Sequence, residues 1–244
     1  MRLAPHAPSV ALQHDVRRHF EWTHDDDVAS ARGLLQACDG HPQANELGWS
    51  AESRHGTLAR LHHQLHQASQ IVLVGAAVKG DDLDRPWMDN TVFVAADGAV
   101  GACFDRVDVL CVVTDLDGGP HLSRAAEHGI PLIVHAHGDN VGRWKDCLKH
   151  WASHGGVPLV LTHQTDEHFP GMHNVGGFTD GDRAACLLSA LGVPLDRVCY
   201  VGYAVDHVGG WSGSTDPQRK LEKLMWMERV LNLLDKSWNT KTKP

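Results

Sequence analysis

Residues 109–119 read VLCVVTDLDGG, an apolar run followed at once by two carboxylates one residue apart, Asp115 and Asp117. The run is continuous rather than alternating and is rich in Val, as expected of a strand buried on both faces of a parallel sheet. Ligands of such sheets bind just past the carboxyl ends of the strands. The stretch therefore predicts an α/β fold and places two acidic side chains where its binding crevice is expected.

Five further runs of the same kind surround this one. They are short, apolar and rich in Val and Ile, and they lie at 71–75, 92–96, 131–135, 158–162 and 197–202. Helix-like segments are expected between several of them, at about 121–128, 140–154 and 180–191. Strand–helix alternation is typical of a mainly parallel sheet with right-handed crossovers and flanking helices.

The chain before the first strand has a different pattern. It is polar and helix-like, and leucines recur at helical spacing after Ser50, a candidate N-cap. We therefore expect a mostly helical N-terminal segment over residues 1–68, followed by an α/β catalytic domain over residues 69–244.

The last expected helix begins with Asp216 as N-cap and Pro217 at the first helical position. Its apolar stripe consists of five residues at helical spacing, Leu221, Leu224, Met227, Leu231 and Leu234. The stripe predicts packing against the core, and a homodimer interface would have the same pattern.

The composition disfavours several classes of protein. The formal charge of −8 argues against nucleic-acid binding, which needs Lys and Arg against phosphates, but it allows a nucleotide that Mg²⁺ bridges to carboxylates. No apolar stretch approaches the roughly 20 residues of a membrane span, and the start of the chain has no apolar signal-peptide core. The six cysteines show no C-x-x-C spacing. Together these features predict a cytoplasmic protein with free thiols and no membrane partner.

Acidic or amide side chains follow the expected strands at four places. They are Asp97-Gly98, Asp115 with Asp117, HAHGDN at 135–140 and FTDGDR at 178–183. One such group alone is usually a helix cap or a turn residue. Several carboxylates at one edge of a sheet repel one another unless a divalent cation neutralises them, and oxygen ligands suit Mg²⁺. We therefore expect a Mg²⁺ site at this edge.

The stretch GGFTDGDR, residues 176–183, has features of a phosphate site. Gly176 and Gly177 let backbone N–H groups approach a ligand closely. Thr179 is suited to cap the helix that follows, and Arg183 offers a forked cation that matches phosphate oxygens. The alternative is an ordinary glycine turn with a capping Thr, in which Arg183 pairs with a nearby Asp.

Four functions remain open from these residues. A haloacid-dehalogenase-type phosphatase would use Asp115 as nucleophile and Asp117 as acid, although that fold carries its motif on the first strand. A metal-dependent hydrolase would use His135 and His137 as a zinc pair. Transfer of a phosphoryl or diphosphoryl group from ATP fits the carboxylates, the glycine turn and the absence of an obvious covalent nucleophile. A nucleotide-binding module without turnover is the non-enzymatic alternative.

Taken in order, the motifs AADGA, TDLDG, HAHGDN, NVGGFTDGDR, GYAVD and RKLEKL resemble those of the archaeal-type 6-hydroxymethyl-7,8-dihydropterin diphosphokinases, the MptE-like family. The resemblance covers roughly residues 70–235 and extends in arrangement to the thiamin pyrophosphokinases. It implies a thiamin pyrophosphokinase-like catalytic domain that uses Mg²⁺ and ATP, passes a diphosphate to the hydroxymethyl group of the pterin and releases AMP. A place in folate or methanopterin biosynthesis is also implied. One turn differs, because this chain reads GAAVKGDD at 75–82 where the family usually has a Gly-x-Gly-Pro-Ser-type turn.

The resemblance also implies roles for individual residues. The metal ligands would be Asp97, Asp115, Asp117 and Asp139. The catalytic group would comprise Asp115, Asp117, Asp139 and His137, with His137 as a candidate general base. The residues expected to bind the nucleotide or the pterin are Gly98, Asn140, Gly176, Gly177, Thr179, Asp180, Asp182 and Arg183.

Overall fold

The computed structural model describes residues 3–213 and 216–241, and in this part of the chain seven parallel strands form one sheet. The strands are β1 (Gln70–Val74), β2 (Thr91–Ala96), β3 (Val109–Thr114), β4 (Leu132–Ala136), β5 (Leu159–His163), β6 (Met172–His173) and β7 (Val198–Val201). The six apolar runs are therefore confirmed as strands. Strand β6 was not expected, since two residues are too few to show a strand pattern.

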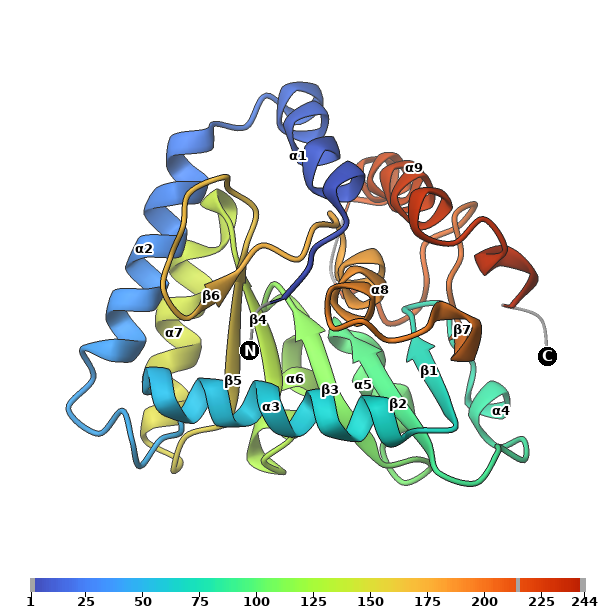
Figure 1. Cartoon of the computed structure of the whole chain (residues 1–244), viewed down its shortest axis with the longest axis horizontal. Coiled ribbons are helices and arrows are strands. Elements are labelled where there is room, and N and C mark those ends of the chain that lie inside the picture. The colour runs from blue at the N-terminus through green and yellow to red at the C-terminus, as the bar shows by residue number, and fades with distance from the viewer. Residues whose placement is uncertain (1–2, 214–215, 242–244) are drawn as a thin grey trace.

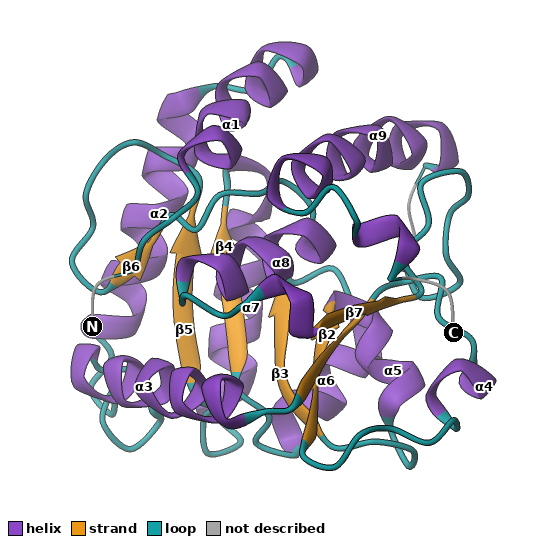
Figure 2. Cartoon of the chain, turned by 45° about the vertical axis from the view of Figure 1, so that its right-hand side comes forward, coloured by secondary structure: helices purple, strands orange, loops and turns teal. Residues whose placement is uncertain are grey.

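Helices cover both faces of the sheet, as Figures 1 and 2 show. In chain order they are α1 (Ala7–Phe20), α2 (His24–Asp39), α3 (Ala51–Gln67), α4 (Gly80–Leu83), α5 (Val100–Cys103), α6 (Gly119–Glu127), α7 (Val141–Ala152), α8 (Asp180–Ala190) and α9 (Pro217–Leu234). Helices α2, α5, α6 and α7 pack on one face, and α3, α8 and α9 pack on the other. The expected α/β class with flanking helices is confirmed.

The side chains of each strand enter the two core layers in turn, because successive side chains point to opposite faces of the sheet. In β1, Val72 and Val74 join the core under α2 and α5, whereas Ile71 and Leu73 join the core under α3 and α8. All four side chains are fully buried. A strand buried on both faces therefore reads as a continuous apolar run, which is why the sequence shows no alternation.

The strand order is β6-β5-β4-β3-β2-β1-β7. The chain moves outward from β1 to β6 one strand at a time and then returns through α8 to place β7 on the other side of β1. The order of the strands therefore reverses between β1 and β7. Such a reversal opens a crevice at the carboxyl ends of the strands, where open α/β sheets bind their ligands.

The helix ends that the sequence indicates are confirmed. The Ser50 hydroxyl accepts a hydrogen bond from the Ser53 backbone N–H at 3.2 Å, and Asp216 accepts one from the Arg219 N–H at 2.7 Å. Along the α9 stripe, Leu224, Met227 and Leu231 are buried, and Leu234 packs partly against the same core. Leu221, by contrast, is 37% exposed, so the stripe is shorter than expected. The homodimer stays a prediction.

The helical N-terminal segment packs closely on the sheet. Helix α2 lies beside β4, β5 and α7, and α3 lies across β5. Arg17 of α1 forms a buried ion pair with Asp27 of α2 at 3.3 Å and donates to the Gln164 carbonyl at 2.7 Å. These contacts bring the turn between α1 and α2 to the carboxyl end of the sheet. The domain boundary at residue 68 stays a prediction.

Most of the cysteines lie in the core. All six cysteines are free, and Cys38, Cys103, Cys111 and Cys186 are buried as small apolar side chains. Over residues 3–213 and 216–241, no helix has both the length and the apolar character needed to cross a membrane.

Acid is expected to destabilise the fold through His163 at the end of β5. Burial, followed by the charges of His173 and His168, lowers the pKa of His163 from 6.5 to about 4, and its Nδ1 accepts the Thr165 N–H. Since the unfolded chain takes up this proton first as the pH falls, the free energy of unfolding should drop by about 2 kcal/mol between pH 7 and pH 5. Urea unfolding of the wild type and of His163→Gln at both pH values tests this. The variant should show a flatter dependence, and an equally steep one would contradict the assignment.

Candidate functional site

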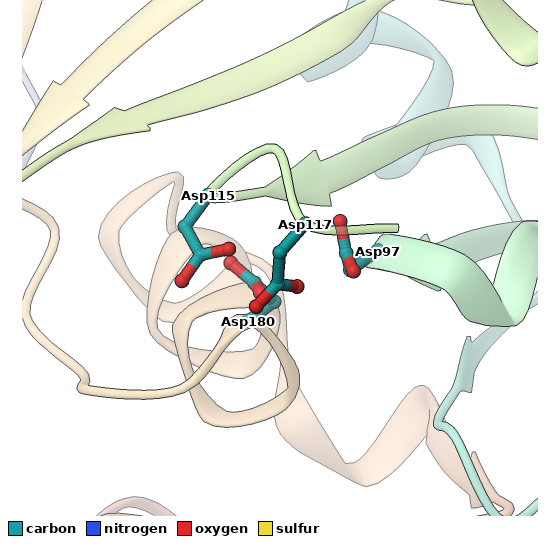
Figure 3. Close-up of side chains that lie close together, drawn as sticks. All are labelled: Asp97, Asp115, Asp117 and Asp180. Carbon is teal, nitrogen blue, oxygen red and sulfur yellow. The ribbon is translucent and has the colours of Figure 1, made fainter. Parts of the chain in front are cut away.

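Four carboxylates converge at the carboxyl edge of the sheet (Figure 3). Asp97 follows β2, Asp115 and Asp117 follow β3, and Asp180 is the first residue of α8. One carboxylate oxygen from each lies within 4.8 Å of those from the other three. We call these residues the acidic cluster. Three of them are the expected metal ligands, and the fourth is Asp180 in place of Asp139.

A tight backbone arrangement holds the first part of the cluster. The Thr114 hydroxyl donates to Asp97 Oδ1 at 2.5 Å and accepts the Leu116 N–H at 2.8 Å. Asp97 and Leu116 have positive φ values of 48° and 77°, which side-chain-bearing residues rarely adopt. A Cβ on Gly118 would lie 2.8 Å from Asp97 Oδ1, so only glycine fits there. Strain of this kind at a ligand edge is typical of functional sites.

His137 orients Asp115. Its Nδ1 accepts the Asp139 backbone N–H at 3.2 Å, so the ring proton is on Nε2, which lies 3.4 Å from Asp115 Oδ2. Burial by itself would raise the pKa of Asp115, but His137, with Arg183 and Lys223, holds it well below its usual range. The other oxygen, Asp115 Oδ1, is buried and has no hydrogen-bond partner in the described part of the chain. An ionised carboxylate with a bare buried oxygen is prepared for a cation.

The pKa values of Asp97 and Asp180 are raised, because both carboxyl groups are buried beside other carboxylates. Burial, together with the charges of Asp180, Asp117 and Asp115, raises the pKa of Asp97 well above its usual value. Burial and the charge of Asp115 raise the pKa of Asp180 in the same way, although Arg183 donates to it at 2.9 Å. A divalent cation would remove this repulsion, and clustered carboxylate oxygens are the ligands that Mg²⁺ prefers. The residues present therefore fit a Mg²⁺ ion.

Basic side chains flank the acidic cluster on one side. Lys220 and Lys223 of α9 line a pocket at the cluster together with Arg183 of α8. Burial lowers the pKa of Lys223, whereas the charges of Asp115 and Asp117 favour its charged form. The two lysines belong to the RKLEKL motif, but no role was expected for them from the sequence. Their contribution depends on how α9 docks, which helical periodicity alone does not give.

Two pockets meet at the acidic cluster. The first, the β1–β7 pocket, lies where the strand order reverses and is lined by Gly75, Ala76, Gly202, Tyr203, Trp211 and Met227, among others. The second, the tryptophan pocket, is lined by Trp22, His137, Gln164, Phe178, Arg183 and Lys223, among others. Four residues line both pockets: Asp117, Thr179, Asp180 and Lys220. The cluster therefore lies between two separate binding spaces.

The divergent turn after β1 is part of the first pocket. Ala77 donates its N–H to the Gly202 carbonyl at 2.9 Å, and Ala76 accepts the Trp211 N–H at 3.0 Å. A Cβ on Gly75 would lie 2.6 Å from the Gly202 carbonyl oxygen, which explains why this glycine is present. Lys79 is exposed and lines neither pocket.

Two predicted site residues, Asp182 and Asn140, are held by hydrogen bonds within the fold. The carboxylate of Asp182 accepts the N–H groups of Phe178 and Thr179 at 2.6 and 2.7 Å and is completely buried, so it closes the start of α8. Asn140 is also completely buried, and its amide donates to the carbonyls of Asp115 and His135. Neither side chain lines either of the two pockets, and the substrate-binding roles expected for them stay predictions.

Asp139 does not join the acidic cluster. It is exposed and lines a small neighbouring pocket with Trp22, Asp26 and His137. Its backbone N–H fixes the His137 ring. The geometry thus offers Asp180 as the fourth metal ligand and gives no support to Asp139 in that role.

The predicted glycines shape the backbone without lining either pocket. Gly176 and Gly177 have φ values of 85° and 83°, and a Cβ on Gly177 would lie 2.8 Å from the Arg183 Cα. A Cβ on Gly98 would lie 2.5 Å from the Trp211 carbonyl oxygen. The residues of the GGFTDGDR stretch that line one or both pockets are Phe178, Thr179, Asp180, Gly181 and Arg183. Arg183 pairs with Asp180, as the simpler alternative for this stretch expected.

The histidines of HAHGDN do not form a zinc pair in the described residues. His135 is completely buried, with its two ring nitrogens 3.0 Å from Thr162 Oγ1 and 3.2 Å from Gln164 Oε1. Burial lowers the pKa of His135 well below its usual value. His135 therefore supports the sheet, and only His137 faces the site.

The chain is similar to two proteins from archaea. No family model matches it. A protein from Methanothermobacter thermautotrophicus is 32% identical over 191 residues, which cover 64% of this chain and 78% of that protein. A protein from Pyrococcus furiosus is 32% identical over 156 residues, which cover 61% of this chain and 64% of that protein. Both relatives are named 6-hydroxymethyl-7,8-dihydropterin pyrophosphokinase.

Proposed function

Because this chain belongs to the 6-hydroxymethyl-7,8-dihydropterin pyrophosphokinase family, we propose that it transfers a diphosphate from ATP to the hydroxymethyl group of 6-hydroxymethyl-7,8-dihydropterin and releases AMP. The family identified from the sequence motifs is confirmed. The reaction would supply an activated pterin for folate or methanopterin biosynthesis.

The observation that carries this proposal is the acidic cluster with its bare oxygen, Asp115 Oδ1. Asp97, Asp115, Asp117 and Asp180 would hold Mg²⁺ in this arrangement. When bound, Mg²⁺ supplies neutralisation of the phosphate charge that builds up during transfer. Diphosphoryl transfer requires little covalent chemistry from the protein and depends on positioning and electrostatics.

The chain's own residues supply the remaining requirements. His137 keeps Asp115 ionised and fixes its direction, so its role is positioning rather than removal of a substrate proton. Lys220, Lys223 and Arg183 place positive charge beside the cluster, where the phosphate oxygens of ATP would lie. The hydroxymethyl oxygen of the pterin then attacks the β-phosphorus and loses its proton to solvent, the bond from the β-phosphorus to the α,β-bridging oxygen breaks, and AMP leaves with that oxygen.

Two substrates must reach one reacting phosphate from different sides. The two pockets that share Asp117 and Asp180 offer this arrangement. We assign ATP to the β1–β7 pocket, because backbone groups and apolar side chains at a strand-order reversal suit a nucleoside. The tryptophan pocket is then left for the pterin.

The test is direct incubation with ATP, Mg²⁺ and 6-hydroxymethyl-7,8-dihydropterin, with AMP measured by chromatography. We expect AMP to appear in step with the pterin diphosphate and only when both substrates are present. Hydrolysis of a generic phosphomonoester without AMP would favour the phosphatase instead. Tight ATP binding without turnover of either substrate would favour a nucleotide-binding module.

A further inference from the structure

Trp22 is held as an aromatic wall of the tryptophan pocket. It lies in the turn between α1 and α2 and is half-buried. Its ring stacks on Phe20, with centroids 4.9 Å apart, and packs against Phe178 at 5.9 Å. Lys223 and Arg219 lie over it at 5.7 and 5.9 Å. These contacts fix the plane of the indole before any ligand arrives.

The Trp22 ring stacks loosely with the ring of His137. The two rings are within 23° of parallel, and their centroids lie 6.4 Å apart, towards the outer end of the roughly 4.5–7 Å range of aromatic pairs. Both rings line the tryptophan pocket, and both also line an adjoining pocket that contains Glu21, Asp26 and Asp139. His137 in turn reaches Asp115 of the acidic cluster. A flat ring that stacks on Trp22 at this place would lie next to the reacting phosphate.

We propose that Trp22 contacts the substrate directly and that the pterin ring stacks on its indole face beside His137. This inference rests on the proposed function and extends it to the site of the second substrate. The hydroxymethyl carbon is attached directly to the ring, so the ring must lie close to the transferred phosphate. Trp22, connected through His137 to Asp115, meets this requirement.

The surroundings of Trp22 favour a pterin over adenine. The adjoining pocket is lined by Glu21, Asp26 and Asp139, which repel the triphosphate of a nucleotide. A pterin presents two adjacent donors, the N3–H and the 2-amino group, and such an edge suits acceptor oxygens. Adenine presents a donor beside an acceptor, so only one of its groups matches. The carboxylates of the adjoining pocket therefore favour the neutral, donor-rich ring of the pterin.

Equilibrium binding of each substrate separately tests the inference. The probes are 6-hydroxymethylpterin, the oxidised form of the substrate, and α,β-methylene-ATP with Mg²⁺, which cannot release AMP. For Trp22→Ala we expect pterin affinity to fall on the order of tenfold or more, since base–aromatic stacking is lost. Affinity for the ATP analogue should change less than about twofold and shows that the variant is folded. Trp22→Phe, which keeps an aromatic face, should retain most of the pterin affinity.

Two further variants serve as a control and as a replacement for Trp22→Ala. Trp87→Ala removes a half-buried tryptophan that lines neither pocket, so it should leave both affinities unchanged. If Trp22→Ala does not fold, Trp22→Leu keeps an apolar side chain in the stack and still removes the aromatic face. It should show the same selective loss of pterin affinity.

The possible results separate this inference from the function beneath it. Normal AMP release with unchanged pterin affinity in the Trp22 variants overturns the inference alone. Loss of affinity for the ATP analogue with pterin affinity intact assigns Trp22 to the nucleotide and overturns it as well. A wild type that neither binds the pterin nor releases AMP overturns both the function and the inference.

Discussion

Replacement of Asp115 by Asn is expected to reduce AMP formation by about 10³-fold while the fold stays intact. The substitution preserves the shape of the side chain but removes the charge that His137 holds in place. Asp115 belongs to the acidic cluster, and its buried Oδ1 has no hydrogen-bond partner among the described residues. Steady-state AMP release at saturating ATP measures the effect, and circular dichroism with thermal unfolding checks the fold.

Asp139→Asn is the matched control for this variant. Asp139 was expected among the metal ligands, but it lies outside the acidic cluster and is exposed. The Mg²⁺ concentration for half-maximal activity should therefore stay as in the wild type. A large rise for Asp139→Asn with normal activity for Asp115→Asn would reverse the assignment of the ligands.

Asp182→Ala is expected to destabilise the protein by about 3 kcal/mol, because the N–H groups of Phe178 and Thr179 lose their acceptor in a buried place. The Thr179 hydroxyl loses the same partner. Urea unfolding followed by circular dichroism measures the change in free energy. The folded fraction should bind both substrates with nearly normal affinity, because Asp182 lines neither pocket.

The opposite result would restore the role that the sequence suggested for Asp182. Near-normal stability with a large loss of pterin or ATP affinity would mean that its carboxylate contacts a substrate. Asp196→Ala, a substitution in the 3₁₀ turn before β7, serves as the control and should leave both stability and binding close to those of the wild type.

Most of the architecture could be predicted from local pattern. Strands buried on both faces need continuous apolar runs, and helices need caps such as Ser50 and Asp216, so these elements are visible in the sequence. Strand β6 and the short helices α4 and α5 were not visible, because two to four residues carry no period. Their positions follow from the packing of longer neighbours.

The carboxylates at the strand ends could be predicted because parallel strands share one carboxyl edge. Asp97, Asp115 and Asp117 needed only this rule. Asp180 and Asp139 could not be ranked by it, since both follow candidate elements of the same edge. Which of the two joins the cluster depends on where α8 begins relative to β3, and in the structure it is Asp180.

The sequence by itself determined the α/β class, the family and the acidic edge, since strand burial and the Asp-containing motifs are local properties of the chain. Only the tertiary structure decided which residues of HAHGDN and GGFTDGDR face the site and which close a cap or a turn. It also brought Lys220, Lys223 and Trp22 to the carboxylates from opposite ends of the chain. The physical reason is that a helix or turn carries its own pattern, whereas its place against a distant strand depends on packing of the whole core.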